Sequence, residues 1–214
     1  MNKTLGLNMR NHLIIYAKRP LPGYAKTRLG AEIGIESSAG VYARLLYSYL
    51  YDLLHQKSPS LSIELSVASP EDTAYFEYAF PELSVTPQLK GDLGARMAAS
   101  FQQAFQKGAQ AVVLTGSDIL GLNRSIIKRA FSTLEIHPGV IGPAPDGGYY
   151  LIGMQAPGCN LFNDITWSTQ DVLAQTKNLA HEQNLNLIHL PTLKDMDDSD
   201  EYWAWRDNID LKNM

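Results

Sequence analysis

A cluster of basic residues stands at the end of the first apolar run of the sequence. The stretch YAKRPLPGYAKTRLG closes the run HLIIYA and contains Lys18, Arg19, Lys26 and Arg28, with Gly23 between the two pairs. Arginine can bind a phosphate through paired hydrogen bonds and lysine through its point charge, and glycine permits backbone angles closed to other residues. The stretch therefore predicts either a phosphate-binding loop or a solvated turn. It lacks the spacing G-x-x-x-x-G-K-[ST], so it is not a P-loop.

Acidic residues follow three other apolar runs. Asp118 comes after AVVLTG, Asp146 lies in PDGG after GVIGPA, and Asp195 and Asp197 follow LNLIHLPTL. Carboxylates are preferred ligands of Mg²⁺, and two acids spaced two apart share a face of an extended segment. The alternative reading is structural: Asp118 would cap a turn, PDGG would be a hairpin turn, and the late acids would begin a helix.

Segments typical of strands and helices alternate along the chain. Runs of buried type or with a period of two predict strands, and apolar residues at helical spacing predict helices. The predicted strands are residues 13–17, 61–69, 83–88, 111–116, 139–144, 149–154 and 185–190. The predicted helices are residues 38–56, 71–80, 93–108, 124–134, 168–184 and 199–209. This order predicts an α/β fold with a mostly parallel sheet, in which ligands bind beyond the carboxyl ends of the strands. Basic and acidic groups would then converge on one crevice, which is the composition expected for nucleotide phosphates bridged by Mg²⁺.

Composition narrows the class of protein. The chain has 214 residues, of which 45% are hydrophobic and 19% charged, and its formal net charge is -4. This length suits one domain. The negative net charge argues against nucleic acid as the main partner. No apolar run approaches the roughly 20 residues of a membrane span. Its first residues show no signal-peptide pattern, and Cys159 is the only cysteine, which excludes an intrachain disulfide. We expect a cytoplasmic protein. A tyrosine-rich stretch between Tyr42 and Tyr51 covers more than one helix face and leaves a homodimer open.

Six motifs together resemble one family. AKRPLPGYAKTRLG, KGDLGARM, LTGSDILGL, GPAPDGGYYLIGM, WST and DMDD are similar to motifs of the radical-SAM/selenodomain-associated transferase 1 family, commonly labelled glycosyltransferases. That family belongs to the nucleotide-diphospho-sugar transferase superfamily. The resemblance runs from about residue 12 to 205, so we expect a single domain over residues 1–214. More distantly, the basic loop and DGGY resemble the 2-phospho-lactate and molybdenum-cofactor guanylyltransferases. The implied fold is a GT-A type, Rossmann-like three-layer α/β/α sandwich.

The resemblance also implies roles for individual residues. Lys18, Lys26 and Arg28 would contact nucleotide phosphates. Asp118 would be the principal ligand of Mg²⁺ or Mn²⁺, with further ligands in the late Asp-x-Asp pair. The implied base or ribose pocket is formed by Gly91, Asp92, Leu93, Gly94 and Arg96. The implied acceptor side is formed by Asp146, Gly147, Gly148 and Ser168.

Three functions are compatible with these residues. In glycosyl transfer from a nucleoside-diphosphate sugar, Asp146 would act as base toward a small-molecule acceptor. In nucleotidyl transfer from a nucleoside triphosphate, Lys26 and Arg28 would stabilise the departing pyrophosphate. A nucleotide-binding module without catalysis is the third, and the complete set of basic and acidic positions counts against it. GT-A glycosyltransferases usually carry Asp-x-Asp where this chain has GSD, which is closer to nucleotidyltransferases. We favour glycosyl transfer because the resemblance covers nearly the whole chain.

Overall fold

The computed structural model describes residues 10–55, 58, 60–155 and 160–212. Cys159 lies outside these residues. Seven strands form one sheet in the order β3-β2-β1-β4-β6-β5-β7. Their bounds are β1 (Asn11–Ala17), β2 (Leu61–Val67), β3 (Ser84–Pro87), β4 (Ala111–Thr115), β5 (Gly139–Pro143), β6 (Tyr149–Met154) and β7 (Leu187–His189). β6 runs antiparallel to both β4 and β5, and the other neighbouring pairs are parallel. The prediction of a mostly parallel sheet is confirmed.

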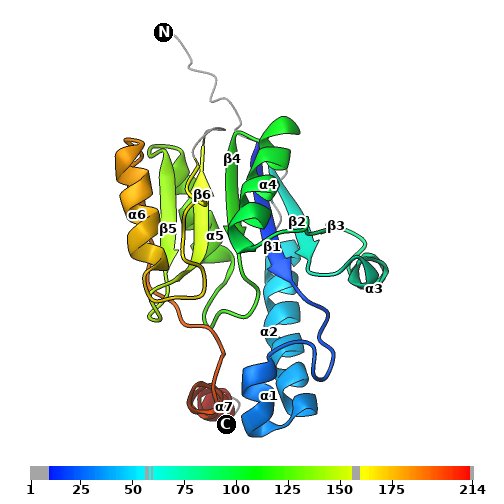
Figure 1. The fold of residues 1–214 in the computed structure, drawn as a ribbon. Coiled ribbons are helices and arrows are strands. Elements are labelled where there is room, and N and C mark those ends of the chain that lie inside the picture. The colour runs from blue at the N-terminus through cyan, green and yellow to red at the C-terminus, as the bar shows by residue number, and fades with distance from the viewer. Residues whose placement is uncertain (1–9, 56–57, 59, 156–159, 213–214) are drawn as a thin grey trace.

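Helices cover both faces of this sheet (Figure 1). Their bounds are α1 (Thr27–Ile33), α2 (Ile35–His55), α3 (Thr73–Ala79), which follows the 3-10 turn η1 (Pro70–Asp72), α4 (Leu93–Gln106), α5 (Arg124–Leu134), α6 (Val172–Glu182) and α7 (Ser199–Lys212). Alternate residues of β1 face opposite sides, as the pleat requires. Leu13 packs in a core with α2 and α5, and Ile14 packs in a second core with α4 and α6. The result is the predicted three-layer sandwich.

The structure differs from the predicted elements at two places near the carboxyl edge. α1 begins within the stretch predicted as a loop, at Thr27. The helix predicted from residue 168 begins at Val172, because Ser168 has a φ of 65° and cannot continue a right-handed helix. Residues 168–171 form a turn instead, and the N–H of Leu173 donates to the carbonyl oxygen of Gly147 at 2.8 Å. That bond fixes the start of α6 against the β5–β6 turn.

The tyrosines of α2 divide between core and surface. Tyr42 and Tyr49 are buried, and Tyr51 is 58% exposed beside the ring of Phe80. The exposed ring leaves the expectation of a homodimer untested. Within the described residues, no helix combines the length and the apolar character that a membrane crossing requires.

Candidate active site at the carboxyl edge of the sheet

Chain segments far apart in sequence meet where β1 and β4 end. β1 and β4 are parallel neighbours, so Lys18 and the Gly116-Ser117-Asp118 turn leave the sheet at the same edge. The segment at Asp195 reaches the same place because it forms an antiparallel bridge with Ile119. Two backbone hydrogen bonds support the bridge: Met196 N–H donates to the carbonyl of Asp118, and Leu120 N–H to that of Lys194. This pairing brings the late acids beside Asp118.

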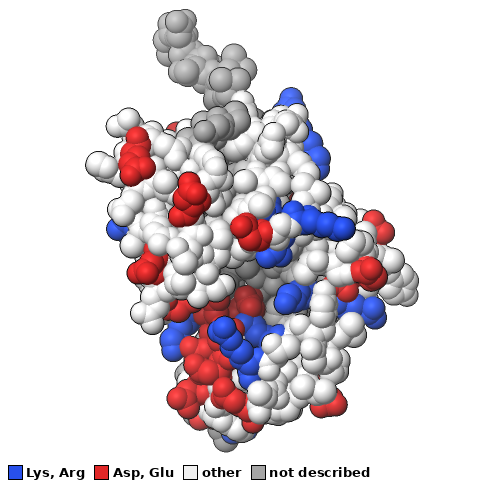
Figure 2. All heavy atoms as spheres, in the orientation of Figure 1, with Lys and Arg blue, Asp and Glu red and all other residues white. Residues whose placement is uncertain are grey.

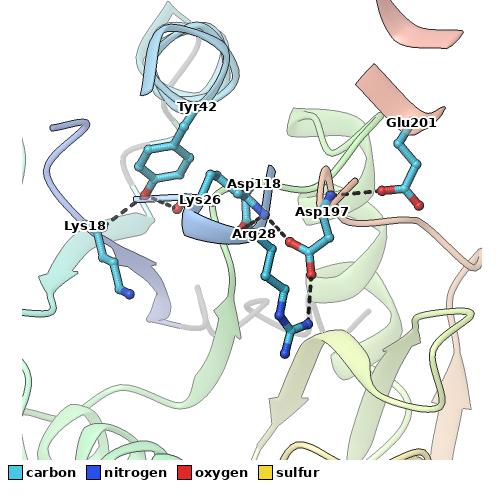
Figure 3. A network of polar contacts seen from close by, with 8 residues as sticks. Lys18, Lys26, Arg28, Tyr42, Asp118, Asp197 and Glu201 are labelled. Atoms are coloured by element: carbon cyan, nitrogen blue, oxygen red, sulfur yellow. Dashed lines mark hydrogen bonds and ion pairs between the residues drawn. The ribbon is translucent and has the colours of Figure 1, made fainter. Parts of the chain in front are cut away.

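Lys26 lies at the centre of the site. Its ammonium is 2.5 Å from Asp118 Oδ2 and 2.6 Å from Asp197 Oδ1, and its side chain is only 6% exposed (Figure 3). Burial works against the charged form, but the two carboxylates outweigh burial and raise the pKa of Lys26. Its backbone is left-handed, with a φ of 53°, directly before α1. Such a conformation is uncommon for a residue with a side chain, and it aims the ammonium between the two acids.

Asp195 has a different environment from the two acids that pair with Lys26. Its Oδ1 is buried and has no hydrogen-bond partner among the described residues. Burial, reinforced by the charge of Asp118, raises the pKa of Asp195 to about 7. Its carboxyl is therefore available to a proton or to a cation.

Asp197 and the basic loop are anchored by residues that the sequence did not single out. Glu201 Oε2 accepts a hydrogen bond from the backbone N–H of Asp197 at 2.9 Å. The hydroxyl of Tyr42 accepts a hydrogen bond from the backbone N–H of Lys18 at 3.0 Å (Figure 3). The same hydroxyl lies 2.8 Å from Ser117 Oγ. Position alone could have suggested Ser117, which precedes Asp118. Tyr42 and Glu201 lie on helices and become visible only once those helices are placed.

Two adjoining hollows open at this edge. The first, here called the basic pocket, has a volume of about 460 Å³, and its charged lining residues are Lys18, Lys26, Arg28, Arg96, Asp118 and Asp197. The second, here called the acidic pocket, has a volume of about 570 Å³, and its charged lining residues are Arg28, Asp118, Asp146 and Asp195. Arg28 and Asp118 line both, so the pockets share a wall. Figure 2 shows red and blue side chains gathered around this hollow, below the middle of the molecule.

The basic pocket ends at the start of α4. Arg96 donates to Gln88 Oε1 at 2.7 Å, and the amide of Gln88 donates to the carbonyl of Ser66 at 3.0 Å. This chain fixes the guanidinium and amide planes at the pocket wall, which Leu93 also lines. Asp92, predicted to face the nucleotide, accepts from Ala95 N–H as the N-cap of α4. Gln88 was not predicted from sequence.

Aromatic residues form part of the acidic pocket. Trp167 and Tyr149 line it, with ring centroids 6.5 Å apart in an edge-to-face arrangement. Gly94 allows the approach of Trp167, because a Cβ at that position would lie 2.5 Å from Trp167 Nε1. The Trp167 ring thus both packs against the core and forms part of the pocket surface. Gly148 and Ser168, which the resemblance assigns to the acceptor side, line the same pocket.

Six predicted site residues line neither pocket: Asp92 and Gly94, described above, and Arg19, Gly23, Gly91 and Gly147. The guanidinium of Arg19 stacks over the ring of Tyr75 at 4.4 Å. Gly23 and Gly91 are turn residues with φ of 72° and 134°. Gly147 has a φ of 87°, and a Cβ there would lie 2.1 Å from the carbonyl oxygen of Gln170. These positions shape the loops that carry the pocket residues.

The carboxylates suit a hard divalent cation in type. Asp118, Asp195 and Asp197 supply only oxygen ligands, as Mg²⁺ prefers, and Asp195 offers an unpartnered oxygen. Among the residues that the structure describes, no three His, Cys, Asp or Glu side chains are grouped as a ready metal site. The ammonium of Lys26 lies between two of the acids. A bridging cation therefore requires Lys26 to move.

This arrangement of layers and strand ends is the fold of the nucleotide-diphospho-sugar transferases. A crystal structure from Desulfovibrio desulfuricans G20, provisionally described as such a transferase, matches with a TM-score of 0.79 and 31% identity. The match covers 89% of this chain and 83% of that one. The chain belongs to the DUF2064 family, described as an uncharacterized protein conserved in bacteria, which matches residues 53–169.

More distant structures share the fold. A CMP:2-keto-3-deoxy-manno-octonic acid synthetase complexed with CTP matches with a TM-score of 0.60 and 8% identity, over 95% of this chain and 99% of that one. A mannosyltransferase from Pyrobaculum calidifontis, in complex with GDP-Man and Mn²⁺, matches with a TM-score of 0.51 and 14% identity, over 92% of this chain and 59% of that one. A comparison with proteins of curated function finds no match.

Proposed function

We propose that the protein is a divalent-metal-dependent transferase that uses a nucleotide-activated donor, and that it transfers a glycosyl group from a nucleoside-diphosphate sugar. The observation that carries the proposal is a basic pocket and an acidic pocket that meet at Asp118. The first provides cations for a diphosphate, and the second provides carboxylates for an acceptor and a metal. The similar structures include a synthetase complexed with CTP and a mannosyltransferase in complex with GDP-Man, which supports binding of a nucleotide donor by this fold.

The proposal includes the family, the domain organisation, the compartment and the metal that were expected from the sequence. It assigns the chain to the radical-SAM/selenodomain-associated transferase 1 group, on the motifs given above. It treats residues 1–214 as a single domain that acts in the cytoplasm with Mg²⁺ as its metal. The Mn²⁺ in the mannosyltransferase structure supports the use of a divalent ion in this fold.

The basic pocket would bind the donor. Lys18 and Arg28 would contact the diphosphate, and Arg96 and Gln88 would face the nucleoside. Asp118, Asp195 and Asp197 would hold Mg²⁺, which neutralises phosphate charge when bound. Lys26, released from the carboxylates, would stabilise the negative charge that builds on the leaving diphosphate.

The acidic pocket would bind the acceptor. The acceptor hydroxyl oxygen forms a bond to the anomeric carbon as the bond from that carbon to the diphosphate oxygen breaks. Asp146 would take the hydroxyl proton as general base. Its Oδ1 accepts the backbone N–H of Gly148 at 2.9 Å, which orients the carboxylate at the tip of the β5–β6 turn.

Nucleotidyl transfer is the second candidate. The observation that favours it is that Asp118 is the lone acid of the GSD turn and pairs directly with Lys26. An acceptor oxygen would attack the α-phosphorus of a nucleoside triphosphate, and pyrophosphate would leave. Lys26 and Arg28 would then bind pyrophosphate instead of a nucleoside diphosphate.

Calorimetric titration with nucleoside-diphosphate sugars and nucleoside triphosphates, with and without Mg²⁺, distinguishes the two reactions. Mg²⁺-dependent binding of one diphosphate sugar, with triphosphates weaker, supports glycosyl transfer. Tighter binding of a triphosphate supports nucleotidyl transfer, and binding of neither class would refute both. Asp118→Asn should abolish the metal dependence. Asp164→Asn is the matched control, because Asp164 is exposed and lines neither pocket.

A further inference from the structure

We infer that the acceptor is an uncharged, hydroxyl-bearing molecule with an apolar face, such as a carbohydrate or a phenol, and that phosphorylated acceptors are excluded. The inference rests on the proposed function, since it concerns the acceptor in the acidic pocket. It adds the chemical class of the acceptor, because the two pockets differ in the charge and the polarity of the residues that line them.

The first support is the balance of charge between the pockets. Among the described lining residues of the acidic pocket, three are acids and Arg28 is the sole Lys or Arg. Arg28 lies at the surface, with 85% of its side chain exposed, and its guanidinium is 4.0 Å from Asp197. In the basic pocket, four Lys and Arg residues face two acids. An anionic group is therefore drawn to the basic pocket and repelled from the acidic one.

A metal at the shared wall would not remove this difference. Asp118 and Asp195 belong to the proposed ligand set, and a bound divalent ion would neutralise their charges. Asp146 comes from the β5–β6 turn and is not in the proposed ligand set. It makes no ion pair with any residue that the structure describes, so its charge would still face the acceptor.

The second support is the apolar wall of the acidic pocket. Met97, Leu114 and Ile152 line it together with the rings of Tyr149 and Trp167. Trp167 is held in place by the close approach of Gly94. Aromatic rings bind the apolar faces of other rings by stacking or edge contacts. Such a wall suits the face of a sugar or a phenol, whereas a phosphate would lose hydration against it without gaining donors.

The third support is the polar rim. Ser168, Thr169 and Gln170 line the acidic pocket where the turn before α6 meets the β5–β6 turn. Ser168 and Gln170 offer a hydroxyl and an amide, which can each donate and accept hydrogen bonds. The hydroxyl of Thr169 donates to the carbonyl of Thr166 and accepts from the N–H of Asp171, which holds the turn in shape. Uncharged partners of this kind match the hydroxyls of an acceptor. The pocket thus combines an apolar face, neutral hydrogen-bonding groups and excess negative charge.

Fluorine NMR of 5-fluorotryptophan-labelled protein tests the inference through Trp167, with Trp167→Phe to assign the resonance. The probes are glucose and p-nitrophenyl glucoside against glucose 6-phosphate and p-nitrophenyl phosphate, in the presence of Mg²⁺. We expect the neutral probes to shift the Trp167 resonance at concentrations at least tenfold below those of the phosphorylated ones. Equal or stronger shifts by the phosphorylated probes would overturn the inference, and so would no shift by any of the four.

A charge reversal makes the test sharper. Asp146→Lys should raise the affinity for the two phosphorylated probes at least tenfold. Asp146→Asn should reduce the difference in affinity between the neutral and the phosphorylated probes. Glu135→Lys is the control for the same change in net charge, because Glu135 is exposed and lies outside both pockets. Unaltered discrimination in both Asp146 variants would contradict the role of charge. Donor binding is read separately by calorimetry, so a failed donor assay rejects the proposed function, and a failed Trp167 assay rejects only the acceptor class.

Discussion

Replacing Lys26 by methionine isolates the effect of one positive charge. The substitution removes the ammonium that lies 2.5 Å from Asp118 and 2.6 Å from Asp197, and it keeps an apolar stem of similar length. Both residues tolerate a left-handed backbone equally poorly, so the strain before α1 is unchanged. We expect the variant to be less stable than the wild type and to bind Mn²⁺ more tightly.

The size of the stability loss follows from burial. Breaking a fully buried ion pair by removing one partner costs about 3–5 kcal/mol. Lys26 is buried, but Asp118 and Asp197 are 29% and 49% exposed, so water screens their repulsion. We therefore expect a loss of about 2 kcal/mol. For a chain of this length, that corresponds to a fall in Tm of about 6 °C.

The metal response separates this explanation from simple loss of packing. In the wild type, a metal ion must displace the ammonium of Lys26 from Asp118 and Asp197. In Lys26→Met, the two carboxylates repel each other and no ammonium competes with the metal ion for them. Without donor, we expect Mn²⁺ to bind about tenfold more tightly to the variant, a difference of about 1.4 kcal/mol. Saturating Mn²⁺ should then restore most of the lost Tm.

Scanning calorimetry and a Mn²⁺ titration followed by electron paramagnetic resonance measure the two quantities. Lys177→Met on α6 is the control, since Lys177 is exposed and remote from both pockets. An unchanged Tm, or weaker Mn²⁺ binding in Lys26→Met than in the wild type, would refute the reasoning. The first result would mean that the ion pairs contribute no stability, and the second that Lys26 assists metal binding instead of opposing it.

Three further predictions concern single sites. The pKa of Asp195 is raised from 3.8 to about 7, so the folded state favours the protonated carboxyl. The resulting contribution to the free energy of unfolding is complete below pH 4 and falls by about 4 kcal/mol as the pH rises to 7. Denaturant unfolding at several pH values should therefore show a weaker pH dependence of stability in Asp195→Asn than in the wild type. In Gly94→Ala, the new Cβ meets Trp167, and we expect about 1–3 kcal/mol of destabilisation and a changed Trp167 fluorescence spectrum. Glu64 is buried, but the adjacent imidazole of His12, a hydrogen bond from Thr86 and the charge of Lys107 outweigh burial and lower the pKa of Glu64. The ionised Glu64 therefore stabilises the fold above its unfolded pKa, and this stabilisation is lost in acid. Glu64→Gln should lower the free energy of unfolding by about 1–2 kcal/mol at pH 7 and leave donor binding, measured by calorimetry, unchanged.

Much of the fold follows from local pattern. The helix predicted over 124–134 coincides with α5, because its apolar residues repeat at helical spacing between an Asn cap and a loop. The turn at Asp146 was predicted from PDGG, and the antiparallel pairing of β5 and β6 confirms it. The positions of the acids after strands also follow from sequence, since every parallel strand delivers its next residues to the same edge.

What the sequence could not supply depends on partners far along the chain. Lys26 takes a left-handed conformation to reach Asp118 and Asp197, and no local pattern encodes that geometry. Arg19 has the same charge and lies in the same loop as its basic neighbours, yet Tyr75 on α3 draws it away. The division into two pockets likewise arises from tertiary contacts.

The pairing of Lys26 with Asp197 joins residues 171 positions apart. A chain that grows from its N-terminus presents the basic loop first and Asp118 later. The acids at 195 and 197 come last among these groups. A nascent or truncated chain therefore carries unneutralised cations at this edge and cannot assemble the proposed metal ligands.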